Sequence, residues 1–190
     1  MTHDLSPLRK HIEEIVSLTD SEWQFVASHF EYKSLKKHQF VIQTGQVVDH
    51  EFWILKGLLR TYSLDENGKE HILQFASENY WISDYHAYQY QMPATLFLDC
   101  LEDTHFLSLS FESRELICKE VPAMANFFRV KLNYGFVHLQ QRVLSHLTQT
   151  VEQRYERLID EMPHLIQRVP KKLLASYLGV SRETLSRLKV

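Results

Sequence analysis

Close to the C-terminus, the sequence brings two arginines and a glutamate within six residues: Arg182, Glu183 and Arg187. An arginine side chain can donate two hydrogen bonds to O6 and N7 of guanine, and a carboxylate can accept one from N4 of cytosine. These residue types therefore suit hydrogen bonding to base edges in the major groove of DNA. Such contacts require the three side chains to project from one exposed helix.

Residues 170–189 predict the two helices that would position these side chains. Pro170 suits the first position of a helix, and Gly179 can adopt the positive φ that ends it. Ser181 is a favourable N-cap for a second helix, in which Leu185 faces the first helix. The spacing predicts a helix-turn-helix, and the alternative structure is a plain helical hairpin on the surface.

The charge distribution agrees with binding to phosphates. The chain of 190 residues has a formal net charge of −3, yet residues 165–190 carry +5 and the rest of the chain −8. Contact with a nucleic-acid backbone requires such a local basic patch. The basic residues of the patch are Arg168, Lys171, Lys172, Arg182, Arg187 and Lys189.

The segment Gly179-Val-Ser-Arg-Glu-Thr-Leu-Ser-Arg187 resembles the recognition segment of the Crp/Fnr superfamily of transcription regulators. Members of that superfamily commonly continue into a β-hairpin wing, whereas this chain stops at Val190, so we expect no wing contacts. By position, the resemblance implies base contacts for Arg182, Glu183 and Arg187, and places Lys171, Lys172, Ser181 and Thr184 near DNA phosphates.

The N-terminal half predicts two helices followed by an antiparallel sheet. Helical periodicity covers residues 5–18, and a capping box of Thr19 and Glu22 opens a second helix. Short segments rich in branched and aromatic residues then alternate with glycine-containing turns, which favours an antiparallel barrel or jelly roll. These segments are 40–42, 51–55, 58–62, 71–75 and 105–109. Gly45, residues 52–57, Arg60 and residues 68–70 also resemble the β-roll of the same superfamily.

Residues 122–147 predict one long helix that starts at Pro122. At about 1.5 Å per residue it would reach about 39 Å, too long to bury its two apolar stripes on one small barrel. We expect it to pair with the same helix of a second copy, and the alternative is a helix wholly inside its own subunit. The dimer stripe would comprise Phe128, Leu132, Phe136, Leu139 and Val143.

We therefore expect two domains: a β-roll sensor with the long dimer helix over residues 1–147, and a helix-turn-helix domain over residues 148–190. The whole chain would have an α+β fold. Thr150 and Gln153 form a second capping pair that restarts a helix after the junction, and Pro163 stops this helix.

In cyclic-AMP-binding members of the superfamily, a Gly-Glu pair and a later arginine hold the ribose and the phosphate. The resemblance implies that Ser83 and Asp84 replace the pair and that Ala94 replaces the arginine, so we expect neither cyclic AMP nor cyclic GMP as effector. The aromatic residues of this region either line a cavity for an unknown ligand or fill the core. The candidate pocket comprises Trp81, Ser83, Asp84, Tyr85, Ala94 and Thr95.

Composition and motifs exclude several other classes of protein. The 44% hydrophobic and 24% charged composition is that of a soluble protein, and the absence of an apolar run or signal-peptide layout predicts a cytoplasmic location without a membrane partner. Cys100 and Cys118 are expected to be reduced thiols. No spacing of ligands predicts a metal or another cofactor, and no catalytic motif predicts an enzyme.

The expected partners are double-stranded DNA with two-fold symmetry, a second copy of the chain, RNA polymerase and an unknown effector. The alternative function is that of a ligand-binding or protein-interaction module that no longer binds DNA.

Overall fold

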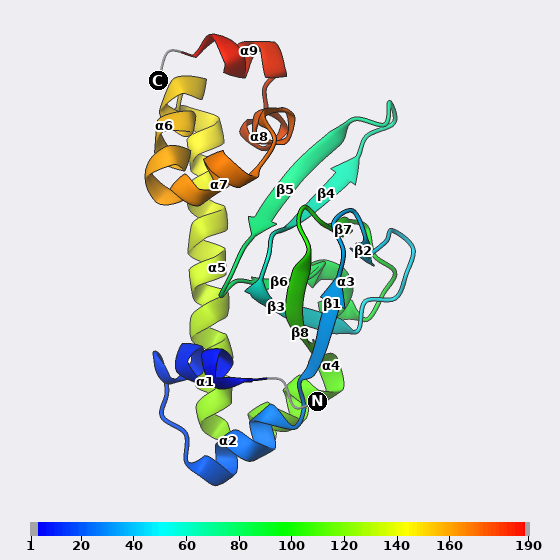
Figure 1. Cartoon of the computed structure of the whole chain (residues 1–190), viewed down its shortest axis with the longest axis vertical. Coiled ribbons are helices and arrows are strands. Elements are labelled where there is room, and N and C mark those ends of the chain that lie inside the picture. The colour runs from blue at the N-terminus through cyan, green and yellow to red at the C-terminus, as the bar shows by residue number, and fades with distance from the viewer. Residues whose placement is uncertain (1–3, 189–190) are drawn as a thin grey trace. The chain divides into compact units, whose positions relative to one another are not determined.

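The computed structural model describes residues 4–188, which form an α+β fold (Figure 1). The helices are α1 (Ser6–Glu13), α2 (Asp20–Ala27), α3 (Tyr85–Tyr90), α4 (Phe111–Glu120), α5 (Pro122–Thr148), α6 (Val151–Glu161), α7 (Pro163–Arg168), α8 (Lys171–Leu178) and α9 (Arg182–Arg187). The strands are β1 (Glu31–Leu35), β2 (Phe40–Ile42), β3 (His50–Lys56), β4 (Leu59–Leu64), β5 (Glu70–Ala76), β6 (Trp81–Ile82), β7 (Phe97–Cys100) and β8 (Thr104–Ser110).

The strands form two four-stranded sheets, with the orders β1-β8-β3-β6 and β2-β7-β4-β5. Strand β8 pairs antiparallel with both β1 and β3, and β2 pairs antiparallel with β7. Only five residues separate β4 from β5, and a connection this short joins antiparallel neighbours, so the two strands make a hairpin. The predicted antiparallel β-roll and the predicted long helix are both confirmed.

Alternation along β3 and β8 divides the core of the β-roll in two. Phe52 and Ile54 of β3 and Phe106 of β8 lie in one buried cluster with residues of β4, α3 and β7. Trp53, between Phe52 and Ile54, faces a second cluster with Leu107, in which α1, α2 and the first turns of α5 take part. Because side chains of a strand point alternately to opposite faces, one sheet buries apolar surface on both sides.

One turn of the roll accepts only glycine. Gly57, between β3 and β4, has φ +116°, and a Cβ there would lie 2.7 Å from the backbone Cα of Thr104. Both the backbone conformation and the neighbouring strand exclude a side chain. Gly57 therefore brings β8 against the β3–β4 turn.

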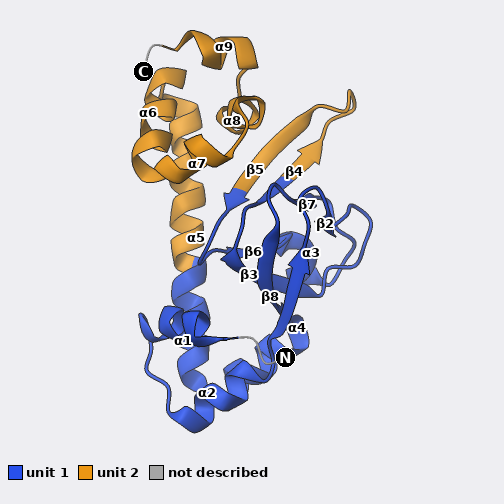
Figure 2. Cartoon of the chain, viewed as in Figure 1, with its two compact units in different colours: residues 1–61, 75–132 blue, residues 62–74, 133–190 orange. Residues whose placement is uncertain are grey.

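The chain divides into two compact units, and the division is discontinuous in sequence (Figure 2). Unit 1 comprises residues 1–61 and 75–132, and unit 2 comprises residues 62–74 and 133–190. Unit 2 therefore combines the end of the β4–β5 hairpin with the C-terminal part of α5 and helices α6 to α9. The buried apolar residues among its described residues are Tyr62, Ile72, Leu158, Leu165, Val169, Leu173, Leu174, Ala175, Leu178 and Leu185.

The structure differs from the sequence-based elements in three places. Helix α1 ends at Glu13 instead of Leu18, because a turn leads directly to the extended N-cap Thr19. The short elements β1, β6, α3 and β7 were not predicted, since they are too brief to show a period. Pro163 does end α6, but it also begins α7, where the missing N–H of proline costs nothing.

Candidate nucleic-acid interface and sensor loop

Helices α8 and α9 are joined by a tight turn at Gly179. This residue has φ +74°, and its N–H donates to the carbonyl of Ser176 (3.1 Å) while the N–H of Val180 donates to that of Ala175 (2.9 Å). Such a left-handed C-cap satisfies the last carbonyls of a helix, as the sequence predicts. Ala175 is almost fully buried, and so is Leu185 of α9. The two helices thus pack together as one pair.

Helix α9 begins at the predicted N-cap. The Oγ of Ser181 accepts a hydrogen bond from the N–H of Thr184 (3.1 Å), which fixes the first turn. The pKa of Glu183 is lowered by hydrogen bonds from its own backbone N–H and from Ser181, and by the charges of Arg182 and Arg187. Glu183 is therefore a carboxylate at neutral pH and can accept a hydrogen bond from a base.

The candidate DNA-contacting side chains are all solvent-exposed. Arg182, Glu183 and Arg187 lie on α9, while Lys171 and Lys172 lie in the first turn of α8. Ser181 and Thr184 are exposed beside them, and their hydroxyls lie 3.1 Å apart. The last basic residue of the predicted patch, Lys189, lies outside the described residues. The structure thus places the candidate base-contacting and phosphate-contacting groups on the helix pair.

Helix α5 exposes an apolar stripe over its C-terminal part. Leu132, Phe136, Leu139 and Val143 are 50%, 67%, 52% and 51% exposed, and steps of four and three residues place them on one side of the helix. Phe128, expected in the same stripe, is only 4% exposed, because it packs edge-on against Trp81 and beneath the guanidinium of Arg114. The exposed stripe therefore starts at Leu132.

The side-chain carboxylate of Asp84 holds together the candidate effector loop between β6 and β7. Asp84, which is 1% exposed, accepts a hydrogen bond from Ala87 N (3.2 Å) and bonds from Thr95 N (2.8 Å), Thr95 Oγ1 (3.3 Å) and Leu96 N (3.0 Å). These bonds supply a buried carboxylate with its required partners. Asp84 therefore braces both ends of the loop.

The other candidate pocket residues are also committed to packing or to backbone contacts. Ser83 donates to His50 O (2.8 Å), and the backbone of the buried Ala94 pairs with Gly45 and Gln46. Tyr85 packs edge-on against the buried Tyr88. Two of the aromatic residues fill the core: Tyr88 is buried within one cluster, and Trp81 is partly buried and packs against the other.

An ion pair inside the roll was not predicted. Arg60 of β4 donates from Nε and Nη2 to the two carboxylate oxygens of Asp99 on β7, at 2.8 and 2.9 Å, and both residues are buried. This bidentate geometry is the strongest arrangement for the two groups. The guanidinium of Arg60 is therefore already neutralised by a protein carboxylate.

Unit 1 also contains a carboxyl group in an apolar setting. Glu51 of β3 is 2% exposed, and its Oε1 lies 3.5 Å from Nε of Arg114. Burial raises the pKa of Glu51 to about 7, and the charge of Arg114 only partly opposes the shift. The protonated form is thus favoured in the folded state below about pH 7.

We expect Glu51 to make folding less favourable as the pH rises. Its pKa is higher folded than unfolded, so its contribution to stability is complete below about pH 4.5 and is lost as the pH rises to about 7. The loss is at most roughly 3–4 kcal/mol. His11 acts in the opposite direction, because burial lowers its pKa to about 4 and it favours folding above about pH 6.5. Denaturant unfolding of the wild type and of Glu51→Gln at pH 5 and pH 8 measures the contribution of this carboxyl group. The free energy of unfolding of the variant, relative to the wild type, should be higher at pH 8 than at pH 5. An equal difference at both pH values contradicts the prediction.

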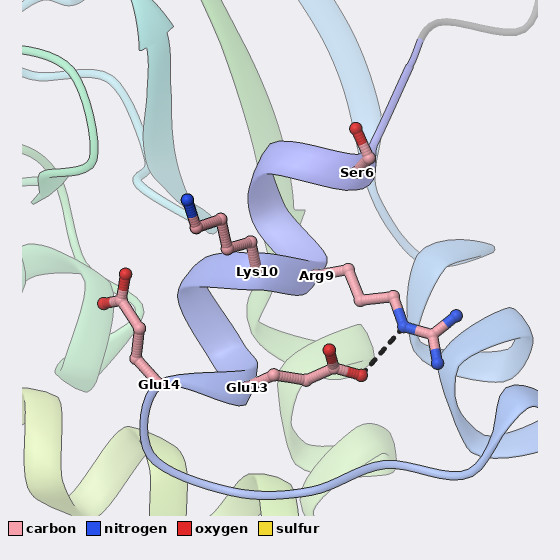
Figure 3. Close-up of a pocket in the computed structure, with 5 residues that line it drawn as sticks. All are labelled: Ser6, Arg9, Lys10, Glu13 and Glu14. Atoms are coloured by element: carbon pink, nitrogen blue, oxygen red, sulfur yellow. Dashed lines mark hydrogen bonds and ion pairs between the residues drawn. The ribbon is translucent and has the colours of Figure 1, made fainter.

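An open hollow of about 340 Å³ lies over α1 (Figure 3). Its lining residues are Ser6, Arg9, Lys10, Glu13 and Glu14. Arg9 is already bonded to Glu13 and to Asp20, at 2.8 Å each, so its charge is not directed to a ligand. We assign no binding role to this hollow.

Residues 4–188 contain no group of three histidine, cysteine, aspartate or glutamate side chains that could hold a metal ion. Cys100 and Cys118 are both free thiols. Across the same range, no helix is both long and apolar enough to cross a bilayer.

Comparison with known proteins shows which family model and which solved structures this chain is similar to. Residues 32–120 match the family model described as the cyclic nucleotide-binding domain. No curated protein sequence matches the chain.

Among solved structures, the regulator CLP of Xanthomonas campestris, described as c-di-GMP responsive, has a TM-score of 0.72 at 13% identity, covering 89% of each chain. FixK2 from Bradyrhizobium japonicum gives 0.72 at 17% identity, over 83% of this chain and 81% of its own. A transcriptional regulator of the Crp/Fnr family from Eubacterium rectale gives 0.69 at 16% identity, over 90% and 81%. The chain thus has the Crp/Fnr fold, and the resemblance inferred from its motifs is confirmed.

Proposed function

We propose that the protein is a homodimeric, sequence-specific DNA-binding transcription regulator that acts in the cytoplasm, without enzymatic activity. The observation that carries the proposal is the α8–α9 pair, which has a buried contact face and exposes Arg182, Glu183 and Arg187. The pair has the features of a helix-turn-helix, whose second helix enters the major groove. The fold shared with Crp/Fnr regulators supports the same function.

Dimerisation through the exposed stripe of α5 would present two such pairs to DNA. A two-fold dimer binds half-sites about one helical turn apart, roughly 34 Å, and its operator is accordingly palindromic. RNA polymerase is the expected further partner of the bound dimer.

Salt dependence of binding tests the DNA-binding function directly. Operator sequences would first be selected from a random DNA pool, and their affinity measured between 50 and 200 mM salt. A protein that neutralises several phosphates should lose affinity steeply over this range, because counterions are released on binding. A flat response, or no enriched sequence, would favour a ligand-binding or protein-interaction module instead.

The effector we propose is neither cyclic AMP nor cyclic GMP. Ala94 offers no cation to a phosphate, and Asp84 places a negative charge in the loop. Arg60, the one cation in strand β4, is bonded to Asp99. What supports the proposal is that no guanidinium of the loop is left to bind the anion.

Cyclic AMP should therefore not change DNA affinity. Loss of one charge-assisted hydrogen bond costs about 1.5–3 kcal/mol, roughly ten- to a hundred-fold in affinity, and leaves the buried phosphate charge unpaired. Calorimetric titration with cyclic AMP and with cyclic GMP measures the nucleotide affinity on which such a change would depend. Micromolar or tighter binding of either nucleotide would show that another cation has replaced the arginine.

A further inference from the structure

Strand β5 stands at the end of its sheet, so within the described residues one edge of its backbone has no neighbouring strand. The hydroxyl of Ser176, on α8, lies on this edge. It donates to the carbonyl of Glu70 (2.6 Å) and accepts a bond from the N–H of Ile72 (3.3 Å). Residues two apart in a strand present their backbone groups to the same edge. The side chain of Ser176 thus satisfies two backbone groups of β5 that a neighbouring strand would otherwise bond. Ser176 belongs to α8, the helix that precedes α9.

A second group fastens the same elements from α5. The guanidinium of Arg142 donates to the carbonyls of Ile72 (3.1 Å) and Leu73 in β5 and of Tyr177 (3.2 Å) in α8. Its carbon centre also lies 4.0 Å from the centroid of the Tyr177 ring. The carbonyl of Tyr177 is one of the last in α8, where a cation also opposes the helix dipole. One side chain therefore connects three elements of unit 2.

The positions of α8 and α9 are linked. The Gly179 turn and the buried Leu185 hold the two helices against each other, so whatever fixes α8 also fixes the direction in which α9 presents its side chains. All of these contacts lie within unit 2, which includes the end of the β4–β5 hairpin (Figure 2).

We propose that Arg142 is a positioning residue for DNA recognition: it fastens α8 to the β4–β5 hairpin and to α5, and so sets the orientation of α9. The inference rests on the proposed DNA-binding function. The planar fork of arginine is what the geometry requires, because donors on both of its terminal nitrogens are used and its face stacks on Tyr177. A lysine keeps the charge but cannot make this set of contacts.

The test compares the variants Arg142→Lys and Ser176→Ala with the matched control Arg129→Lys. Arg129 lies on the same helix as Arg142, but its side chain is exposed and bonds to the nearby Asn126. Hydrogen exchange of peptides covering β5 and α8 reports the fastening itself. Both variants should exchange faster there than the wild type, and the control should not. Unchanged exchange in Arg142→Lys would overturn the proposal.

The ratio of specific to non-specific DNA affinity then separates positioning from mere stability. Binding to a selected operator should fall about tenfold or more in Arg142→Lys, the equivalent of one lost charge-assisted hydrogen bond. Non-specific binding at low salt should change little, since phosphate contacts tolerate a tilted helix pair. An equal fall in both affinities would overturn the positioning role. If the variant exchanges faster but the wild type binds no DNA, the DNA-binding function is refuted. The contacts of Arg142 with β5 and α8 would then still be supported.

Discussion

Replacing Leu139 by glutamate should convert the proposed dimer to monomers and abolish tight operator binding. Leu139 is about half exposed in the single chain, and glutamate is a good helix former, so the monomer should keep its fold. In a two-fold dimer the change occurs twice. Because only about half of each leucine is still exposed in the single chain, its burial in the dimer contributes about 0.8–1.5 kcal/mol. The pair of changes therefore removes about 1.5–3 kcal/mol, to which the facing carboxylates add repulsion. This corresponds to a dimer at least about tenfold weaker.

Sedimentation at several protein concentrations measures the outcome, and operator titration should show the loss of the second half-site. Gln141→Glu is the matched control: it adds the same charge to the same helix, but at about 100° per residue it lies opposite the Leu132–Val143 stripe. If Leu139→Glu sediments as the wild type does, the dimer interface lies elsewhere.

The second large effect is expected at the arginines of α9. Arg182→Ala and Arg187→Ala should each weaken binding to the selected operator by about 1–3 kcal/mol and relax the preference at one guanine. Both side chains are exposed and lie on a helix whose first turn is capped by Ser181, so removing them should leave the fold intact.

Lys172→Ala should behave differently from the arginine variants. A phosphate contact carries no sequence information, so affinity should fall alike for all sequences and the salt slope should decrease by about one. Lys119→Ala, which removes a positive charge from the exposed surface of unit 1, is the control and should leave binding unchanged. Identical behaviour of Lys172→Ala and the arginine variants would mean that base and phosphate contacts have been assigned wrongly.

The elements that could be predicted from the sequence are those whose signals are local. The capping boxes at Thr19 and Thr150 and the left-handed turn at Gly179 depend on residues three or four apart, and all are present. The same holds for the exposure of the basic residues on α8 and α9, which follows from the helical period.

The contacts that could not be predicted join residues far apart in sequence. Arg60 and Asp99 are 39 residues apart, and Arg142 and Ile72 are 70 apart, so no spacing rule relates them. Phe128 shows the same limit in another form. Periodicity indicates which side of a helix is apolar, but not which part of that side the neighbouring Trp81 covers.

The discontinuous composition of unit 2 has a consequence for how it forms and how it could be transplanted. The hairpin edge at residues 70–73 leaves the ribosome before Ser176 does, and about a hundred residues must be made in between, roughly 5–20 s of translation. Until then β5 has an uncovered edge. For the same reason, a chimera cut in α5 before Arg142 would separate Arg142 and α8 from the strand to which they bond. Grafting the C-terminal helices onto another β-roll therefore requires that roll to supply a matching hairpin.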